Sequence, residues 1–131
     1  MISKATAPHY VWGDRCDGWR LVQSDGLSVI HERMPSRTTE VRHYHRAARQ
    51  FFFIVSGAAV MERGDERVVL RSGEGVEIPP GVSHRIRNES EQDVEFLVVS
   101  APPSQGDRLL DISEPPSEME KRASRPAEGL L

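Results

Sequence analysis

The chain has 131 residues, with 17 basic and 20 acidic side chains, a formal net charge of −3 and a pI near 5.9. This length is enough for one domain with a hydrophobic core but not for two. The negative charge excludes the broad basic surface that nucleic-acid-binding proteins use, so we expect a soluble protein that binds no nucleic acid.

Residues 1–17 show no periodic pattern and contain several turn formers, so we predict an N-terminal arm that lies on the domain or pairs with a second copy. The first twenty residues contain no apolar run, which argues against a signal peptide or a membrane span. Cys16 is the single cysteine and has no partner for an internal disulfide. This suits a reducing compartment, and we predict a cytoplasmic location.

From residue 18 onward, short strand patterns alternate with turn formers. Strands are predicted at residues 19–23, 27–34, 38–45, 50–55, 58–63, 67–71, 76–78 and 94–100, with a further strand that starts at His84. No helical period precedes residue 104. The pattern predicts an all-β sandwich or barrel over residues 18–112.

The stretch 41–57 is predicted to form a strand, a short turn and a second strand. His43 and His45 are two residues apart, so both imidazoles leave the same face of the first strand. Gln50 opens the second strand, and Phe52 and Ile54 share its parity. We therefore expect Gln50, Phe52 and Ile54 to face the interior, where the two apolar side chains would line a pocket.

The other side of the same strand is also apolar, with Phe51, Phe53 and Val55 facing outward. A strand that is apolar on both faces should be covered on both. A homodimer would cover the outer face, and we predict one.

About thirty residues later, Pro79-Pro80-Gly81 forms a tight turn that places His84 and Ile86 on one face of a strand. We expect Ile86 to line the same pocket as Phe52 and Ile54.

Two spaced motifs now resemble those of the cupin superfamily. The first motif is His-x-His, three or four residues, Glu, six residues and Gly, and the chain matches it at His43, His45 and Gly57, with Gln50 in place of Glu. The second motif is Gly, five residues, Pro-x-Gly, two residues, His, three residues and Asn. It is matched by Gly73, Pro79, Gly81, His84 and Asn88.

The resemblance implies a single-domain cupin, a double-stranded β-helix or jelly-roll barrel, in which His43, His45, Gln50 and His84 bind one metal. Imidazole and amide ligands without thiolate suit divalent Zn, Fe, Ni, Mn, Co or Cu and argue against a closed structural zinc site. An alternative role for Gln50 is a hydrogen bond to a neighbouring imidazole or to a bound water.

Residues 113–131 are rich in Glu, Ser and Pro and are predicted to form a flexible tail.

The replacement of Glu by Gln50 leaves the metal with a net charge near +2 instead of +1. Such a centre is a stronger Lewis acid and is harder to oxidise. We therefore predict an isomerase, lyase or cyclase that acts on a small carbonyl, enol or sugar-acid substrate. A cupin-type dioxygenase and a non-catalytic binding or sensor barrel are the alternatives.

The sequence does not identify a catalytic base. Glu32, Glu62 and Glu77 lie on predicted strands whose inward face the pattern leaves open. Arg108 is interpreted as an exposed loop cation, with a position at the barrel mouth as the alternative.

Overall fold

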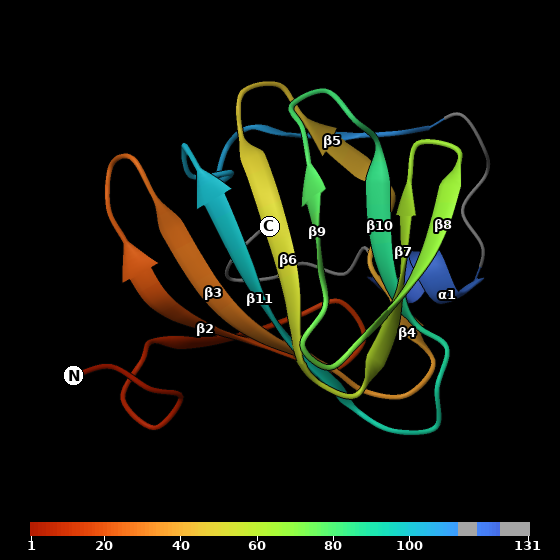
Figure 1. Ribbon diagram of the computed structural model, residues 1–131, viewed down its shortest axis with the longest axis horizontal. Helices are drawn as coiled ribbons and strands as arrows, with labels where there is room; N and C mark the ends of the chain where they lie inside the picture. Colours follow the sequence, from red (N-terminus) through yellow and green to blue (C-terminus); the bar gives the residue numbers. More distant parts are fainter. Residues whose placement is uncertain (113–117, 124–131) are drawn as a thin grey trace.

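The computed structural model describes residues 1–112 and 118–123 (Figure 1). The prediction of a flexible tail at 113–131 lies outside the described residues, except for helix α1 (Glu118–Ala123), which contacts β4. The strands are β1 (His9–Trp12), β2 (Cys16–Gln23), β3 (Ser28–Met34), β4 (Thr38–Thr39), β5 (His43–His45), β6 (Arg49–Ser56), β7 (Ala58–Arg63), β8 (Glu66–Arg71), β9 (Gly75–Ile78), β10 (His84–Asn88), β11 (Val94–Ala101) and β12 (Arg108–Leu110).

The described strands form two antiparallel sheets that face each other across a shared interior (Figure 1). One sheet has the order β1-β2-β3-β11-β6-β9, and the other has the order β12-β5-β10-β7-β8, with β4 paired to β10. The prediction of an all-β sandwich or barrel is confirmed. No helix within the described ranges has the length and apolar composition needed to cross a bilayer.

Strand β6 shows why this sequence forms the centre of a sheet. Gln50, Phe52 and Ile54 are buried in the interior, whereas Phe51 and Val55 are 42% and 43% exposed on the outer face. This alternation is the one predicted from the parity of the strand, and it is confirmed. Each fully buried Phe or Ile side chain contributes roughly 1.5–3 kcal/mol to stability.

Cross-strand rows divide the inner face of this sheet into a polar end and an apolar centre. Ser28 is paired with Ser100, and Ser100 is paired with Gln50, so three polar side chains lie in one row. The next row inward holds Ile30, Val98 and Phe52. The polar row therefore lies at one end of the barrel, above the hydrophobic core.

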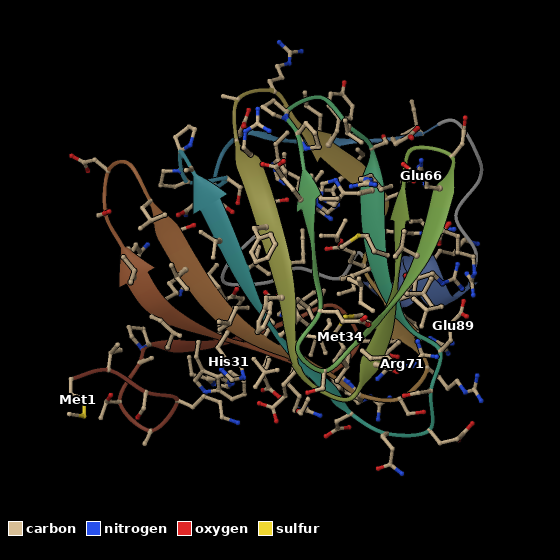
Figure 2. All side chains as sticks on the ribbon, viewed as in Figure 1. Met1, His31, Met34, Glu66, Arg71 and Glu89 are labelled. Carbon is tan, nitrogen blue, oxygen red and sulfur yellow. The ribbon has the colours of Figure 1, made fainter. Side chains whose placement is uncertain are left out.

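Strand β3 is mixed on both faces, and the structure resolves which face looks inward. Ser28, Ile30, Glu32 and Met34 are buried, whereas the alternate residues are partly exposed. Figure 2 shows Met34 between the sheets and His31 on the outer face of the same strand. Glu32 therefore points into the barrel.

The N-terminal segment adds a strand that the sequence pattern did not indicate. β1 pairs with β2, and Tyr10 from β1 is almost fully buried. An edge strand of four residues gives too short a run for a periodic signal. The boundary between arm and barrel at residues 17 and 18 stays a prediction.

Gly57 ends β6 and belongs to the first sequence motif. Its φ is 82°, and an added Cβ would lie 2.5 Å from the carbonyl oxygen of Asp93. Because both the backbone conformation and the space exclude a side chain, glycine is required where the chain passes from β6 to β7.

Candidate metal centre

Three imidazoles meet inside the polar end of the barrel. One ring nitrogen from each of His43, His45 and His84 lies within 4.8 Å of the others, and all three residues are buried. His43 on β5 is the direct cross-strand partner of His84 on β10, so both side chains leave the same face, and His45 follows two residues later. The structure thus brings together the three histidines singled out in the sequence.

Backbone carbonyls fix the tautomers of two of these rings. His43 Nδ1 lies 2.7 Å from the carbonyl oxygen of Val41, and His84 Nδ1 lies 2.9 Å from that of Val82. A carbonyl oxygen only accepts hydrogen bonds, so Nδ1 must donate and carry the proton. In the neutral ring, Nε2 then presents its lone pair to the interior.

Gln50 presents a second lone pair to the same space. Its Nε2 donates a hydrogen bond to Ser100 Oγ at 3.0 Å, which directs Oε1 toward the imidazoles. Oε1 lies 3.1 Å from His84 Nε2. When the His84 ring is neutral, neither of these two atoms carries a proton, and two acceptors face each other across the gap.

Burial keeps the imidazoles neutral and leaves their inward nitrogens without partners. It lowers the pKa of His84 to about 4 and holds the pKa of His43 well below its usual value. Within the described residues, His43 Nε2 and His45 Nε2 are buried with no hydrogen-bond partner. A buried group of this kind needs a partner, and neutral imidazole is the form that binds metals. The residues therefore fit a divalent cation.

The loop between His45 and Gln50 is held by Asp107. The carboxylate of Asp107 accepts hydrogen bonds from the backbone amides of residues 46, 47 and 48 at 2.9–3.1 Å. These hydrogen bonds lower the pKa of the Asp107 carboxyl. Nothing in the sequence signalled this role, because the amides lie about sixty residues away along the chain.

Arg108, next to Asp107, does not lie in an exposed loop, so that expectation is wrong. It begins β12 and is the cross-strand partner of His45. Cross-strand partners project from the same face, so the Arg108 side chain shares the inner side with the imidazoles. Burial lowers the pKa of its guanidinium, consistent with a half-buried position.

The structure separates the three carboxylates that the sequence left undecided. Glu62 pairs with Arg85 on the outside of its sheet at 2.7 Å, and Glu77 is exposed. Glu32 is fully buried in the barrel. A fourth carboxylate, Glu40, is also buried, and sequence reasoning did not identify it.

The apolar residues predicted to line the pocket lie deeper in the barrel. Phe52, Ile54 and Ile86 are all fully buried members of the core. The Phe52 ring makes an edge contact with His84, with a centroid distance of 5.8 Å. Their predicted contact with a substrate stays a prediction.

A family model described as "Cupin domain" matches residues 30–100. Among curated proteins, the chain is 37% identical over 59 residues to the xanthan biosynthesis protein XanB of Xanthomonas campestris pv. campestris, a match that covers 45% of this chain and 12% of that protein. It is 36% identical over 74 residues to protein SchB of Streptomyces halstedii, covering 56% of this chain and 49% of SchB. The chain thus spans about half or less of these two relatives.

A solved structure supports the fold assignment over more of the chain. The polyketide cyclase RemF from Streptomyces resistomycificus superposes with a TM-score of 0.74, covering 92% of this chain and 88% of that one. The two sequences are 15% identical, so this likeness shows the architecture alone.

Proposed function

The chain belongs to the cupin superfamily, and from this premise we propose that it is an enzyme that binds one divalent transition metal through His43, His45, His84 and Gln50. The metal is Zn, Fe, Ni, Mn, Co or Cu. When bound, it supplies Lewis-acid chemistry to a small carbonyl, enol or sugar-acid substrate in an isomerase, lyase or cyclase reaction.

One observation carries this proposal. The Nε2 lone pair of His84 and the amide oxygen of Gln50 point at each other over 3.1 Å. Two buried acceptors at this distance repel unless a positive charge lies between them. The low pKa of His84 disfavours a proton as that charge at neutral pH, which supports a metal cation.

The neutral amide supports non-redox chemistry. Gln50 contributes an oxygen without a charge, so three imidazoles and one amide leave the full +2 charge on the cation. These four ligands include no anion that would stabilise a higher oxidation state of the metal. A developing negative charge on a substrate oxygen is stabilised more strongly than it would be beside a carboxylate ligand.

The relatives are compatible with this class of reaction but do not define the substrate. RemF is a polyketide cyclase by its description, and XanB is a biosynthetic protein for xanthan. We propose a small oxygenated molecule as the substrate of this chain, with no role for nucleic acid or membranes. We also propose a cytoplasmic location.

Gln50→Glu should keep the metal but lower non-redox turnover. The added carboxylate reduces the net charge of the centre, and a loss of about 1.4 kcal/mol in transition-state stabilisation corresponds to tenfold in rate. The test combines elemental analysis of tag-free protein with a screen of sugar acids, β-diketones and enols, and Gln92→Glu in an exposed loop is the control. Unchanged metal content together with unchanged turnover in Gln50→Glu would contradict the charge argument.

Oxygen uptake separates the main proposal from the dioxygenase alternative. In the same screen, substrate loss is expected without O₂ consumption. Stoichiometric O₂ uptake would instead assign the site to oxygenase chemistry. Ligand-induced stabilisation without any turnover would indicate a binding or sensor barrel.

The outer face of the β3-β11-β6 sheet supports a homodimer. Phe51 and Phe53 stack with a centroid distance of 6.2 Å, and they pair across the strands with Val99 and Leu97. We propose that a second copy covers this apolar face. Light scattering should give twice the chain mass of 14.7 kDa for the wild type.

Phe51→Glu should convert this dimer to a monomer, because it places a charge in the apolar contact. Val69→Glu, on the exposed face of the other sheet, is the matched control and should remain dimeric. A monomeric wild-type protein would refute the proposed interface.

A further inference from the structure

The barrel interior holds a second group of polar side chains that the metal centre does not use. Glu32 comes from β3, Tyr10 from β1, Arg108 from β12, and Glu40 from the segment between β4 and β5. Both carboxylates are buried, at 0% and 2% exposure. Buried carboxylates without a close ion pair are rare, and they concentrate at functional sites.

Glu32 has one satisfied oxygen and one free oxygen. Its Oε2 accepts a hydrogen bond from Tyr10 OH at 3.0 Å. Its Oε1 is buried and has no partner among the residues that the structure describes. An unpartnered, fully buried carboxyl oxygen is available to a ligand or to an exchangeable proton.

Glu40 lies one step deeper in the barrel than the imidazoles. Its backbone N–H donates to the carbonyl oxygen of Ile86 at 3.1 Å, and its Oε1 accepts from the Ile86 amide at 2.9 Å. Ile86 follows His84 by two residues on β10 and shares its inward face. Glu40 is therefore fixed next to the metal centre without being one of its ligands.

Arg108 is linked both to the metal centre and to the buried carboxylates. As the partner of His45, it projects from the inner side of β12, and the charges of Glu40 and Glu32 oppose the effect of burial on its pKa. No hydrogen bond to the guanidinium is found in the part of the chain that the structure describes. A half-buried guanidinium with open donors is suited to a substrate carboxylate.

A surface pocket lies on the side of β1 and β3, next to this interior. It is lined by Tyr10, Ser28, Ile30, Ser104 and other residues of the same side. Tyr10 carries the contact to Glu32, and Ser28 lies in the polar row that runs through Ser100 to Gln50. The pocket therefore lies beside residues that contact Glu32 and adjoin the row of Gln50, and its lining includes neither the carboxylates nor the proposed metal ligands.

We propose that Glu40 is the general base of the reaction, that Glu32 and Tyr10 form a protonated pair beside it, and that Arg108 binds the carboxylate of a small, enolisable anionic substrate. This inference rests on the proposed function and adds a substrate class to it. Burial raises the pKa of Glu40 to about 7 and raises the pKa of Glu32 well above its usual value. At neutral pH one carboxyl can therefore accept a proton while its neighbour stays neutral.

The proposed step is a proton abstraction from carbon. The C–H proton of the substrate moves to a carboxylate oxygen of Glu40, and the C–H electron pair forms the C=C bond of an enolate as the carbonyl π pair moves onto oxygen. The proton on the Glu40 carboxyl exchanges with solvent, and transfer of a solvent-derived proton from Glu40 to the same carbon completes the exchange and restores the carboxylate. No oxidant or further reactant is required.

Deuterium exchange tests this step without knowledge of the physiological product. The metal-loaded protein is incubated in D₂O with 2-oxobutyrate, and loss of the C3 protons is followed by proton NMR. The wild type should accelerate the exchange, and Glu40→Gln should lower the rate by about 100-fold with unchanged metal content. Gln keeps an oxygen for the Ile86 amide, so this variant should fold.

Two further variants make the result specific. Glu40→Asp should restore part of the exchange, and Glu77→Gln on the outside of the barrel should behave as wild type. Arg108→Gln should remove the preference for 2-oxobutyrate over its uncharged methyl ester. Equal exchange by the wild type and Glu40→Gln would overturn this inference and leave the metal proposal intact.

The remaining outcomes are also distinct. A wild type that binds metal but exchanges neither probe would overturn the substrate class, and one that binds no metal would overturn the proposed function itself. An infrared spectrum of the metal-free protein gives a readout apart from activity. It should show a protonated-carboxyl band at pH 7 that persists in Glu40→Gln and is weakened in Glu32→Gln, and absence of the band in Glu40→Gln would refute the protonated pair.

Discussion

His84→Ala is expected to abolish stoichiometric metal binding. His84 supplies the ring nitrogen that faces Gln50, and it is the cross-strand partner of His43. Its removal leaves two imidazoles and one neutral amide oxygen, and the lost imidazole is a ligand type that these metals prefer. We expect the affinity for Zn²⁺ or Ni²⁺ to fall by more than about 100-fold, the upper end of the loss seen when only a supporting residue is removed.

Elemental analysis and thermal unfolding measure this effect independently. A metal at 100 times its Kd should stabilise the wild type by about 2.7 kcal/mol, whereas the variant should gain at most about 0.4 kcal/mol at the same concentration. His31→Ala is the matched control, because His31 bonds to Glu95 on the outer face and takes no part in the centre. Retention of one metal per chain by His84→Ala would remove the basis of the proposed function.

The variant also reveals what the imidazole does in the metal-free protein. Two acceptors that face each other inside the barrel destabilise the fold until a cation separates them. His84→Gln can turn its amide N–H toward Gln50 and relieve this repulsion. In the absence of metal it should therefore lose less stability than His84→Ala, while its affinity for metal should stay below that of the wild type.

The strands around the metal centre could be predicted because the local sequence shows which of their residues face inward. Gln50, Phe52 and Ile54 alternate with outward residues, and this period of two gave both the strand and its inward face. The same holds for His43 and His45, whose spacing alone places them on one side. The cupin barrel and the convergence of the histidines followed from such local patterns together with the two spaced motifs.

The interior carboxylates and Arg108 could not be found in this way. Glu32 lies on a strand with both faces mixed, and only its pairing with β11 and the cover from Tyr10 decide that it points inward. Arg108 lies in a polar segment whose strand character depends on pairing with β5, more than sixty residues away. Burial that arises from long-range pairing leaves no periodic signal in the local sequence.

Glu40→Gln is expected to change how stability depends on pH. Burial raises the pKa of Glu40 from 4.5 to about 7 in the folded protein. Between these two values the folded state holds a proton that the unfolded state has released. The contribution of the protonated carboxyl to the stability of the fold is therefore complete below about pH 4.5, and it is lost as the pH rises through 7.

The buried imidazoles have the opposite dependence. His84 has a pKa of about 4 in the folded protein, against 6.5 in its ordinary state, so its contribution is lost as the pH falls below 6.5. The wild-type curve combines both effects. The difference between wild type and Glu40→Gln isolates the carboxyl, because the imidazoles are present in both proteins.

Urea unfolding of the metal-free proteins at a fixed protein concentration gives this difference. Between pH 5 and pH 8 the wild type should lose roughly 2 to 3 kcal/mol relative to Glu40→Gln, because a shift of one pKa unit corresponds to 1.36 kcal/mol. Parallel curves would show that Glu40 titrates normally. A carboxyl with a pKa near 7 is half ionised at neutral pH, the condition under which one group accepts a proton from a substrate and returns it. The stability curve therefore measures the pKa of Glu40 without any substrate. The assignment of Glu40 as the base depends on that pKa.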